Sequence, residues 1–208
     1  MSDLSSTAVV AIWTVVVIAA YIVGTFPSAV LVARANGVDI TTAGSGNPGA
    51  SNVARVLGWR RGIWVFVLDA AKGALPAAAS LLIGAGDNPS IDGRALAYAS
   101  AAAAVLGHVA PATRRFRGGK GVATGGGAFA VLSPVVFLVL IVTWIVVSRL
   151  TRTAAVASVI VVTALPVGVW TMGRRLWEVP ATVGICALVL ARHTGNIRRL
   201  AAGDESRL

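Results

Sequence analysis

Residues 122–147 read VATGGGAFAVLSPVVFLVLIVTWIVV, which is 26 residues without a charged side chain. About 20 apolar residues are enough to cross the hydrocarbon core of a bilayer as a helix, so this run is typical of a membrane-spanning segment. Two interpretations of it are open. The run forms one long span, or Pro134 divides it into a short segment at 122–132 and a second one at 135–147, because proline interrupts helical hydrogen bonding.

The composition of the whole chain is also that of a membrane protein. Of its 208 residues, 56% are apolar and only 12% are charged, whereas a soluble domain carries about 25% charged residues. The missing charge implies that much of the surface faces a lipid bilayer. We expect a single all-α domain over residues 1–208, a polytopic bundle of membrane helices, because each span must satisfy its own backbone hydrogen bonds.

Other apolar segments flank the central run on both sides. They cover residues 7–33, interrupted at Gly24 and Pro27, then 62–86, 95–112, 154–172 with a kink expected at Pro166, and a short one at 179–191. No basic residue precedes the first segment, which favours a retained span over a cleaved signal peptide. The protein therefore has six or seven spans, depending on Pro134.

The distribution of positive charge separates these two counts. The net charge is +10, and the cations lie in short loops between apolar runs, which indicates membrane topology and not nucleic-acid binding. With seven spans and the N-terminus outside, 14 cations lie inside and 3 outside; with six spans the numbers are 10 and 7. Loop cations favour the cytoplasm, so we predict about seven transmembrane helices, with the N-terminus outside and the C-terminus, including Arg207, in the cytoplasm.

The first candidate site segment, residues 43–52, reads AGSGNPGASN, and Arg55 follows it. Small residues allow tight turns, and an arginine offers a planar fork of donors for a phosphate or carboxylate group. The alternative is a flexible turn between spans, with glycine supplying the positive φ angles. The candidates in this segment are Gly44, Ser45, Gly46, Asn47, Asn52 and Arg55.

The second segment, residues 117–124, reads RGGKGVAT. Glycines that lead into a helix expose backbone N–H groups at its positive end, which is typical of an anion site. The order of residues departs from the Walker pattern, because a glycine follows the lysine, so nucleotide hydrolysis is not supported. The alternative is a basic loop that only fixes topology. The candidates are Gly118, Gly119, Lys120, Gly121 and Thr124.

The third segment, residues 192–200, reads RHTGNIRRL and begins where the last apolar run ends. His193 and Asn196 would share one face of a helix, and a histidine titrates near neutral pH. The alternatives are a structural histidine and arginines that only anchor the topology. Arg198 is the remaining candidate in this segment.

Charged residues also occur inside the apolar runs. Asp69 and Lys72 are three residues apart in the second run, where charges are costly and usually paired. We expect them to be chiefly partners of each other. His108, near the end of the third run, shapes a pocket or caps a span.

Cys186 is the only cysteine, which excludes an internal disulfide and a cysteine-based metal site.

Four motifs in order resemble the bacterial acyl-phosphate:glycerol-3-phosphate acyltransferase family. They are residues 44–55, the LDAAKG run at 68–73, Gly107-His108 with FRGGKGVAT at 116–124, and residues 192–200. The chain departs from the family pattern in Val109-Ala110-Pro111, where Phe-Pro is usual, and in Arg117, where lysine is frequent. Asp204 or Glu205 can fill the place of a glutamate that follows the third motif.

The resemblance implies an enzyme of the bacterial inner membrane that transfers a fatty acyl group from acyl phosphate to the sn-1 hydroxyl of glycerol 3-phosphate. It implies catalytic roles for Ser45, Lys120, His193 and Asn196, and substrate binding by the other candidates, without a metal or cofactor. The expected partners are the two substrates and the lipid bilayer. The donor is already activated, so the work of the protein would be to position the substrates and neutralise their charge.

Two other classes compete with this interpretation. A transporter of an organic phosphate or anion would use the same loops as a gate, but paired broken helices within repeated halves are typical of transporters, and the sequence shows no such symmetry. A metal-dependent alcohol phosphotransferase needs clustered carboxylates. Among the eight acidic residues, only Asp69 falls inside a predicted span.

Overall fold

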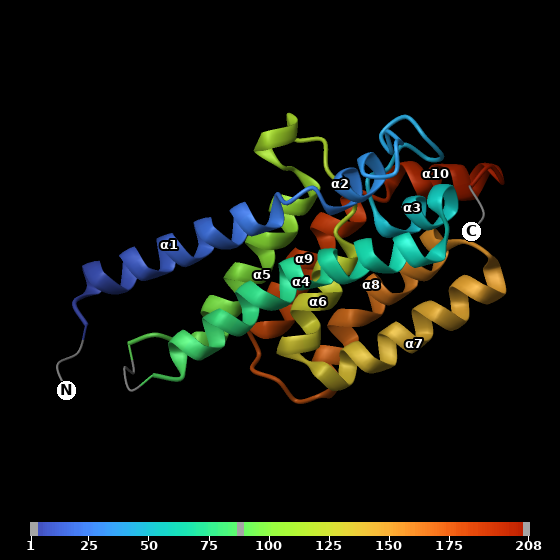
Figure 1. Cartoon of the computed structure of the whole chain (residues 1–208). Helices are drawn as coiled ribbons and strands as arrows, with labels where there is room; N and C mark the ends of the chain where they lie inside the picture. Colours follow the sequence, from blue (N-terminus) through green and yellow to red (C-terminus); the bar gives the residue numbers. More distant parts are fainter. Residues whose placement is uncertain (1–3, 87–89, 206–208) are drawn as a thin grey trace.

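The structure is a computed structural model that describes residues 4–86 and 90–205 (Figure 1). Arg207, which the charge count placed in the cytoplasm, lies outside the described residues. Every regular element among the described residues is helical: α1 (Ser6–Gly24), α2 (Ser28–Arg34), α3 (Ala50–Leu57), α4 (Trp59–Gly84), α5 (Gly93–Val109), the short 3-10 helix η1 (Ala112–Arg114), α6 (Val122–Leu132), α7 (Pro134–Thr151), α8 (Ala154–Thr171), α9 (Glu178–Ala191) and α10 (Thr194–Ala202).

The central apolar run forms two helices, so the single-span interpretation is wrong. Helix α6 ends at Leu132, and α7 begins at Pro134, in the first helical position that proline favours. The first apolar run is also divided: α1 ends at Gly24, and α2 begins directly after Pro27. Pro166, where we expected a kink, lies inside α8.

Five helical stretches are long and apolar enough to cross a membrane within the described part of the chain. They are Ser6–Arg34, Trp59–Gly84, Gly93–Arg114, Pro134–Thr151 and Ala154–Thr171. Helices α6 and α9 have 11 and 14 residues, so they rise only about 16 Å and 21 Å, against a hydrocarbon core of about 30 Å. Length therefore supports five spans, and the remaining two predicted spans are short helices.

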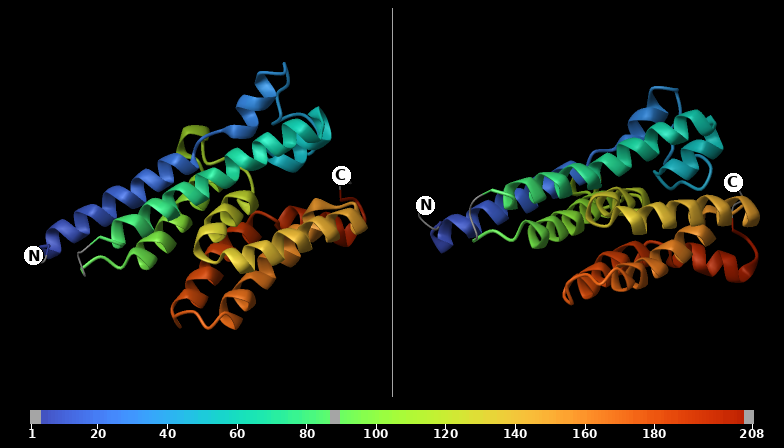
Figure 2. Two further views of the ribbon diagram at one scale, coloured as in Figure 1. Left: turned by 60° about the horizontal axis from the view of Figure 1, so that its bottom comes forward. Right: turned by 90° about the horizontal axis from the view of Figure 1, so that it is seen from below.

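Helix α4 packs most extensively against α6 and α5, and it also contacts α1, α2 and α3 (Figure 2). Glycines make the α4–α6 crossing close: a Cβ atom on Gly73 would lie 1.9 Å from the Thr124 carbonyl oxygen, and one on Gly127 would lie 1.9 Å from that of Ala70. Close approach of backbones at small residues is how membrane helices gain packing energy.

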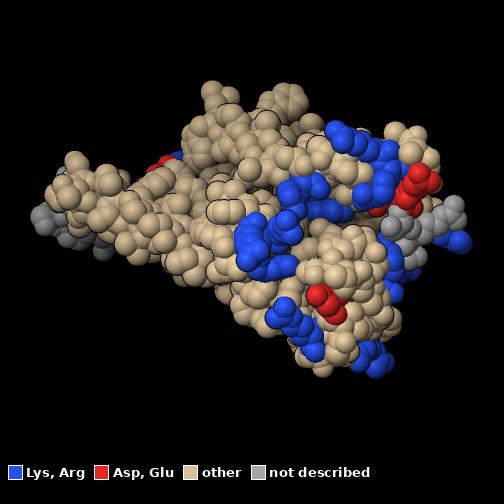
Figure 3. Space-filling view, turned by 90° about the horizontal axis from the view of Figure 1, so that it is seen from above, with Lys and Arg blue, Asp and Glu red and all other residues tan. Residues whose placement is uncertain are grey.

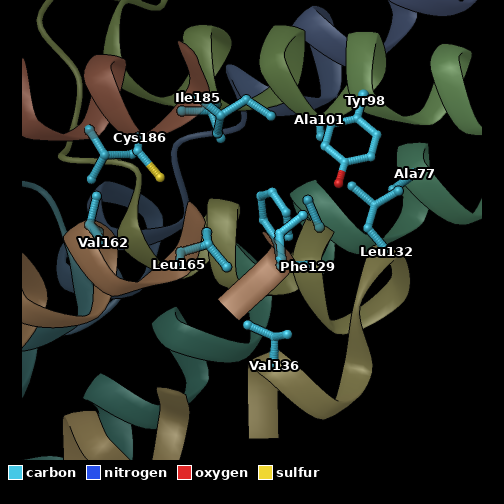
Figure 4. Close-up of a cluster of buried hydrophobic side chains, with 14 of the residues drawn as sticks. Ala77, Tyr98, Ala101, Phe129, Leu132, Val136, Val162, Leu165, Ile185 and Cys186 are labelled. Carbon is cyan, nitrogen blue, oxygen red and sulfur yellow. The ribbon is translucent and has the colours of Figure 1, made fainter. Parts of the chain in front are cut away.

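Helices α5, α6, α8 and α9 share an apolar core (Figure 4). Phe129 is 1% exposed and meets the ring of Tyr98 edge to face, with the ring centroids 5.9 Å apart. By contrast, α1 and α7 turn large apolar side chains outward, such as Val15 (66% exposed) and Val139 (61% exposed). An apolar outer surface of this kind fits helices that are surrounded by lipid.

The two ends of the bundle differ in charge. Figure 3 shows lysine and arginine side chains gathered at the end away from the N-terminus of α1. Exposed arginines lie at the end of α2, at the start of α4, in the loop before α6, at the end of α7 and in α10: Arg34, Arg60, Arg61, Arg115, Arg117, Arg149, Arg152, Arg198 and Arg199. Near the starts of α5 and α9, Arg94 forms an ion pair with Glu178, which also accepts a hydrogen bond from the Tyr98 hydroxyl at 3.0 Å. This pair joins distant parts of the sequence, and the sequence analysis did not foresee it.

Candidate active site

A cavity of about 830 Å³ opens between α3, α4, α6, α7, α8, α9 and α10. Its polar end is lined by all three candidate segments, through Ser45, Asn47, Asn52, Arg55, Lys120, Gly121, His193 and Asn196. Its other arm is lined by apolar side chains, among them Phe66, Phe129, Phe137, Val162, Leu165 and Ile185. Ligand cavities have volumes of about 300–1,000 Å³, so this one suits a long ligand with a polar head and an apolar tail.

The first segment forms a loop that Asn52 holds against α3. Asn52 is 2% exposed; its side-chain oxygen accepts the Ser45 N–H at 2.9 Å, and its amide nitrogen donates to the Ala43 carbonyl at 3.0 Å. Gly44 has a φ angle of +60°, and a Cβ atom there would lie 2.3 Å from the Asn52 side-chain oxygen. Asn52 therefore shapes the loop, and it leaves the Ser45 hydroxyl, on an exposed residue, at the cavity.

The second segment, the glycine loop (residues 117–121), is fastened from two sides. The Gly119 N–H donates to the His108 carbonyl oxygen at 3.1 Å, and the Arg192 guanidinium donates to the carbonyl oxygens of Gly118 and Gly119 at 3.1 Å and 3.3 Å. The N–H of Gly119 is thus engaged within the protein. We expected the N–H groups of this loop to bind an anion, but the Gly119 N–H is not available to a ligand in this conformation.

Gly121 turns the glycine loop into α6 with a φ angle of +87°, which is a conformation that glycine adopts without strain. The first N–H groups of a helix have no acceptor within it, so the start of α6 presents donors and positive potential next to Lys120. Thr124 is fully buried, and its hydroxyl has no hydrogen-bond partner among the described residues. Thr124 does not line the cavity.

The third segment places two buried side chains at the polar end of the cavity. His193 is 1% exposed and Asn196 is 4% exposed. His193 Nδ1 lies 2.8 Å from the Val189 carbonyl oxygen; a carbonyl only accepts, so Nδ1 carries the proton and Nε2 is an acceptor. The Asn196 amide nitrogen donates to Glu205 at 2.6 Å.

Lys120 is the cation at the centre of this arrangement. Burial lowers its pKa to about 8, while the nearby carboxylate of Glu205 opposes the shift and three neighbouring guanidinium groups add to it: those of Arg199, Arg55 and Arg192. Burial also lowers the pKa of His193, which favours the neutral imidazole. The polar end of the cavity is therefore strongly cationic, with a neutral histidine beside it.

Some candidates lie apart from the cavity lining. Gly44, Gly46, Gly118 and Gly119 shape the two loops, and Arg198 is an exposed residue of α10. Two side chains that the sequence analysis did not select are part of the site: Arg192, which holds the glycine loop, and Glu205, which lines the cavity. The available signal was the position of Arg192 at the start of the third motif and of Glu205 shortly after its end.

Asp69 and Lys72 do form the expected pair, at 2.8 Å. The pair belongs to a larger buried network, since Ser28 donates to Asp69 at 2.6 Å and Lys72 Nζ lies 3.1 Å from His108 Nδ1.

Over residues 4–86 and 90–205, no group of three or more His, Cys, Asp or Glu side chains is arranged to hold a metal ion.

The chain matches the family described as glycerol-3-phosphate acyltransferase over residues 14–203. A protein of that name from Shewanella sediminis is 42% identical over 193 residues, which covers 92% of each chain. One from Anaeromyxobacter dehalogenans is 44% identical over 199 residues, covering 93% of this chain and 96% of the relative. This chain belongs to the glycerol-3-phosphate acyltransferase family.

Solved structures agree with this assignment. A crystal structure of PlsY (YgiH), described as an integral membrane glycerol 3-phosphate acyltransferase in its glycerol 3-phosphate form, superimposes with a TM-score of 0.86 at 34% identity, covering 94% of this chain and 95% of that one. Its lysophosphatidic acid form gives a TM-score of 0.84. The family member described here is therefore a multi-pass integral membrane acyltransferase, and the transporter interpretation is not favoured.

Proposed function

We propose that the protein transfers a fatty acyl group from acyl phosphate to the sn-1 hydroxyl of glycerol 3-phosphate. The hydroxyl oxygen attacks the acyl carbonyl carbon, the bond from that carbon to the phosphate oxygen breaks, and lysophosphatidic acid and inorganic phosphate result. The observation that carries this proposal is a cavity that combines a cationic end with an apolar arm, in a member of this family. Two phosphate groups fit the cations, and an acyl chain fits the apolar arm.

The residues at the polar end divide the work of positioning and neutralising charge. Lys120 and Arg55 hold phosphate oxygens through charge-assisted hydrogen bonds, with Arg198 supplying further positive charge from α10. Ser45 and Asn196 donate to a phosphate group or to the developing oxyanion. The glycine loop and the start of α6 supply backbone donors and positive potential for the phosphate group.

His193 orients the attacking hydroxyl. Its Nδ1 is engaged with Val189, so Nε2 is free to accept the hydroxyl hydrogen. The proton then passes to His193 or to a phosphate oxygen of the donor. The variant His193→Gln keeps an acceptor but lacks a base; a large loss of kcat would assign the proton to His193, and near-normal kcat would assign it to the phosphate.

The donor is tested with purified protein and glycerol 3-phosphate. Acyl phosphate, acyl-CoA and acyl carrier protein are supplied in parallel, and lysophosphatidic acid is measured. We expect product only with acyl phosphate, because a free phosphate head matches the cationic end. Equal turnover with acyl-CoA would refute the proposed donor.

Transfer is direct, without an acyl-enzyme. No carboxylate–histidine pair accompanies Ser45 in the sequence to activate it as a nucleophile, and acyl phosphate is already reactive. Mass spectrometry of protein quenched during turnover should show unmodified Ser45. An acyl adduct on this residue would overturn direct transfer.

The protein lies in the bacterial inner membrane, with the N-terminus outside, the C-terminus in the cytoplasm and seven crossings. The two short crossings are α6 and α9; α6 packs against α4, α5 and α7, and α9 packs against α5 and α8. Cysteines introduced at Ser45 and Gly203 in a Cys186→Ala background test this topology. We expect no labelling by an impermeant reagent in intact cells; labelling at either position would refute the orientation.

A further inference from the structure

His108 holds the glycine loop with both its main chain and its side chain. Its carbonyl oxygen accepts the Gly119 N–H at 3.1 Å. A Cβ atom on Gly118 would lie 2.0 Å from that oxygen, and a Cβ atom on Gly119 would lie 2.3 Å from Nε2 of the imidazole. Gly118 and Gly119 therefore pack directly against the last turn of α5, with no room for a side chain. Lys120 is the next residue in the chain. The position of the His108 ring helps to set the position of the loop.

Lys72 determines the tautomer of this ring. Its Nζ lies 3.1 Å from His108 Nδ1 and 2.8 Å from Asp69, with which it forms an ion pair. An ammonium group only donates hydrogen bonds, so Nδ1 must be the acceptor, and the proton of the neutral ring is on Nε2. The Nε2–H side of the ring faces Gly119.

The rest of the network holds Lys72 in place. Lys72 also donates to the Phe26 carbonyl oxygen at 2.8 Å, and Ser28 donates to Asp69 at 2.6 Å. The side chains of Asp69, Lys72 and His108 are all less than 9% exposed. The network thus links the break between α1 and α2 to α4, α5 and the glycine loop. Charged groups at membrane depth are costly, and their retention there points to a function.

The two histidines of the chain are held in opposite tautomers. His108 accepts at Nδ1 and carries its proton on Nε2, whereas His193 donates from Nδ1 to Val189 and accepts at Nε2. The chain contains only these two histidines. Each tautomer is therefore accessible to direct measurement.

We propose that His108 is a positioning residue of the phosphate site: Lys72, neutralised by Asp69, fixes the His108 ring against Gly119 and so sets the place of Lys120 in the cavity. This inference rests on the proposed acyl transfer and adds a group that acts through the glycine loop. Its effect appears in the KM for glycerol 3-phosphate, which we expect to rise about tenfold in Lys72→Met.

Nitrogen-15 NMR of histidine-labelled protein in detergent tests the tautomers. The two signals are assigned with the variant His193→Gln. We expect His108 protonated at Nε2 and His193 protonated at Nδ1, and in Lys72→Met we expect His108 to become a mixture of tautomers. A wild-type His108 protonated at Nδ1 would overturn the proposal. A wild-type spectrum in which both rings are protonated at Nδ1 would do so without the need for any variant.

Kinetics and melting then separate positioning from simple stabilisation. Lys72→Met leaves Asp69 buried without its partner, so the melting temperature falls. The double variant Asp69→Leu/Lys72→Met removes the lone charge and regains much of that loss, but its KM stays raised because His108 still lacks its donor. A double variant that regains both the melting temperature and the wild-type KM would show that the network is only structural.

Glu178→Gln is the matched control. It weakens the buried ion pair with Arg94 near the other end of α5, so it lowers the melting temperature and leaves the KM for glycerol 3-phosphate at the wild-type value. A KM rise in this control equal to that of Lys72→Met would overturn the proposal. Absence of wild-type turnover with acyl phosphate would instead refute the proposed donor and leave the tautomers and the melting data as independent evidence on His108.

Discussion

The pH dependence of the reaction follows from the burial of Lys120. An ordinary lysine has a pKa of 10.5, and burial lowers that of Lys120 to about 8. Lys120 is then about 90% cationic at pH 7 and about 10% cationic at pH 9, whereas an ordinary lysine would stay charged over this range. If only the cation binds phosphate, kcat/KM for glycerol 3-phosphate falls about tenfold between pH 7 and pH 9.

Other groups near Lys120 do not produce this fall. Guanidinium groups are not deprotonated in proteins, so the neighbouring arginines do not contribute to the fall. The pKa of His193 lies below its ordinary value of 6.5, so its titration belongs to the acidic side of the profile. The second ionisation of a phosphate monoester has a pKa of about 6 and is about 90% complete at pH 7, so it changes little above that pH.

The assay measures initial rates with saturating acyl phosphate from pH 6.5 to pH 9.5. The matched variant is Lys120→Arg, whose side chain stays charged and should give a flat profile above pH 7 at whatever rate it supports. A flat wild-type profile up to pH 9.5 would refute the lowered pKa. The same tenfold fall in Lys120→Arg would show that another group titrates.

Three further substitutions test the packing and the site. Gly127→Ala puts a Cβ atom 1.9 Å from the carbonyl oxygen of Ala70 and should lower the free energy of unfolding by about 1–3 kcal/mol. In the control Gly126→Ala the new Cβ atom lies at an ordinary contact distance of 3.6 Å from the Phe137 ring, so this variant should melt at or above the wild-type temperature. Equal melting temperatures of the two variants would contradict the close α4–α6 crossing. Gly119→Ala pushes against the imidazole below the glycine loop and should raise the KM for glycerol 3-phosphate severalfold, and wild-type kinetics would mean that the loop tolerates the shift. Val162→Trp fills the apolar arm and should move the preference toward shorter acyl phosphates in a chain-length series; an unchanged preference would place the acyl chain elsewhere.

The sequence by itself determined the class of fold. An uncharged run such as 122–147 cannot leave its backbone polar groups unpaired in lipid, so it must be helical, and Pro134 ends one helix because it cannot donate the next hydrogen bond. The sequence also located the three site segments, because glycine, serine, asparagine and arginine at the ends of apolar runs have little use in lipid packing.

Tertiary structure alone decided which polar groups serve the site. The sequence did not indicate that the Gly119 N–H is engaged by the His108 carbonyl, that Arg192 holds the glycine loop, or that Glu205 faces Asn196. Each of these depends on how helices distant in the sequence meet. Hydrogen bonds and lowered pKa values act over a few ångströms, so the role of a side chain such as Lys120 is fixed only when packing brings its neighbours together and removes water from around it.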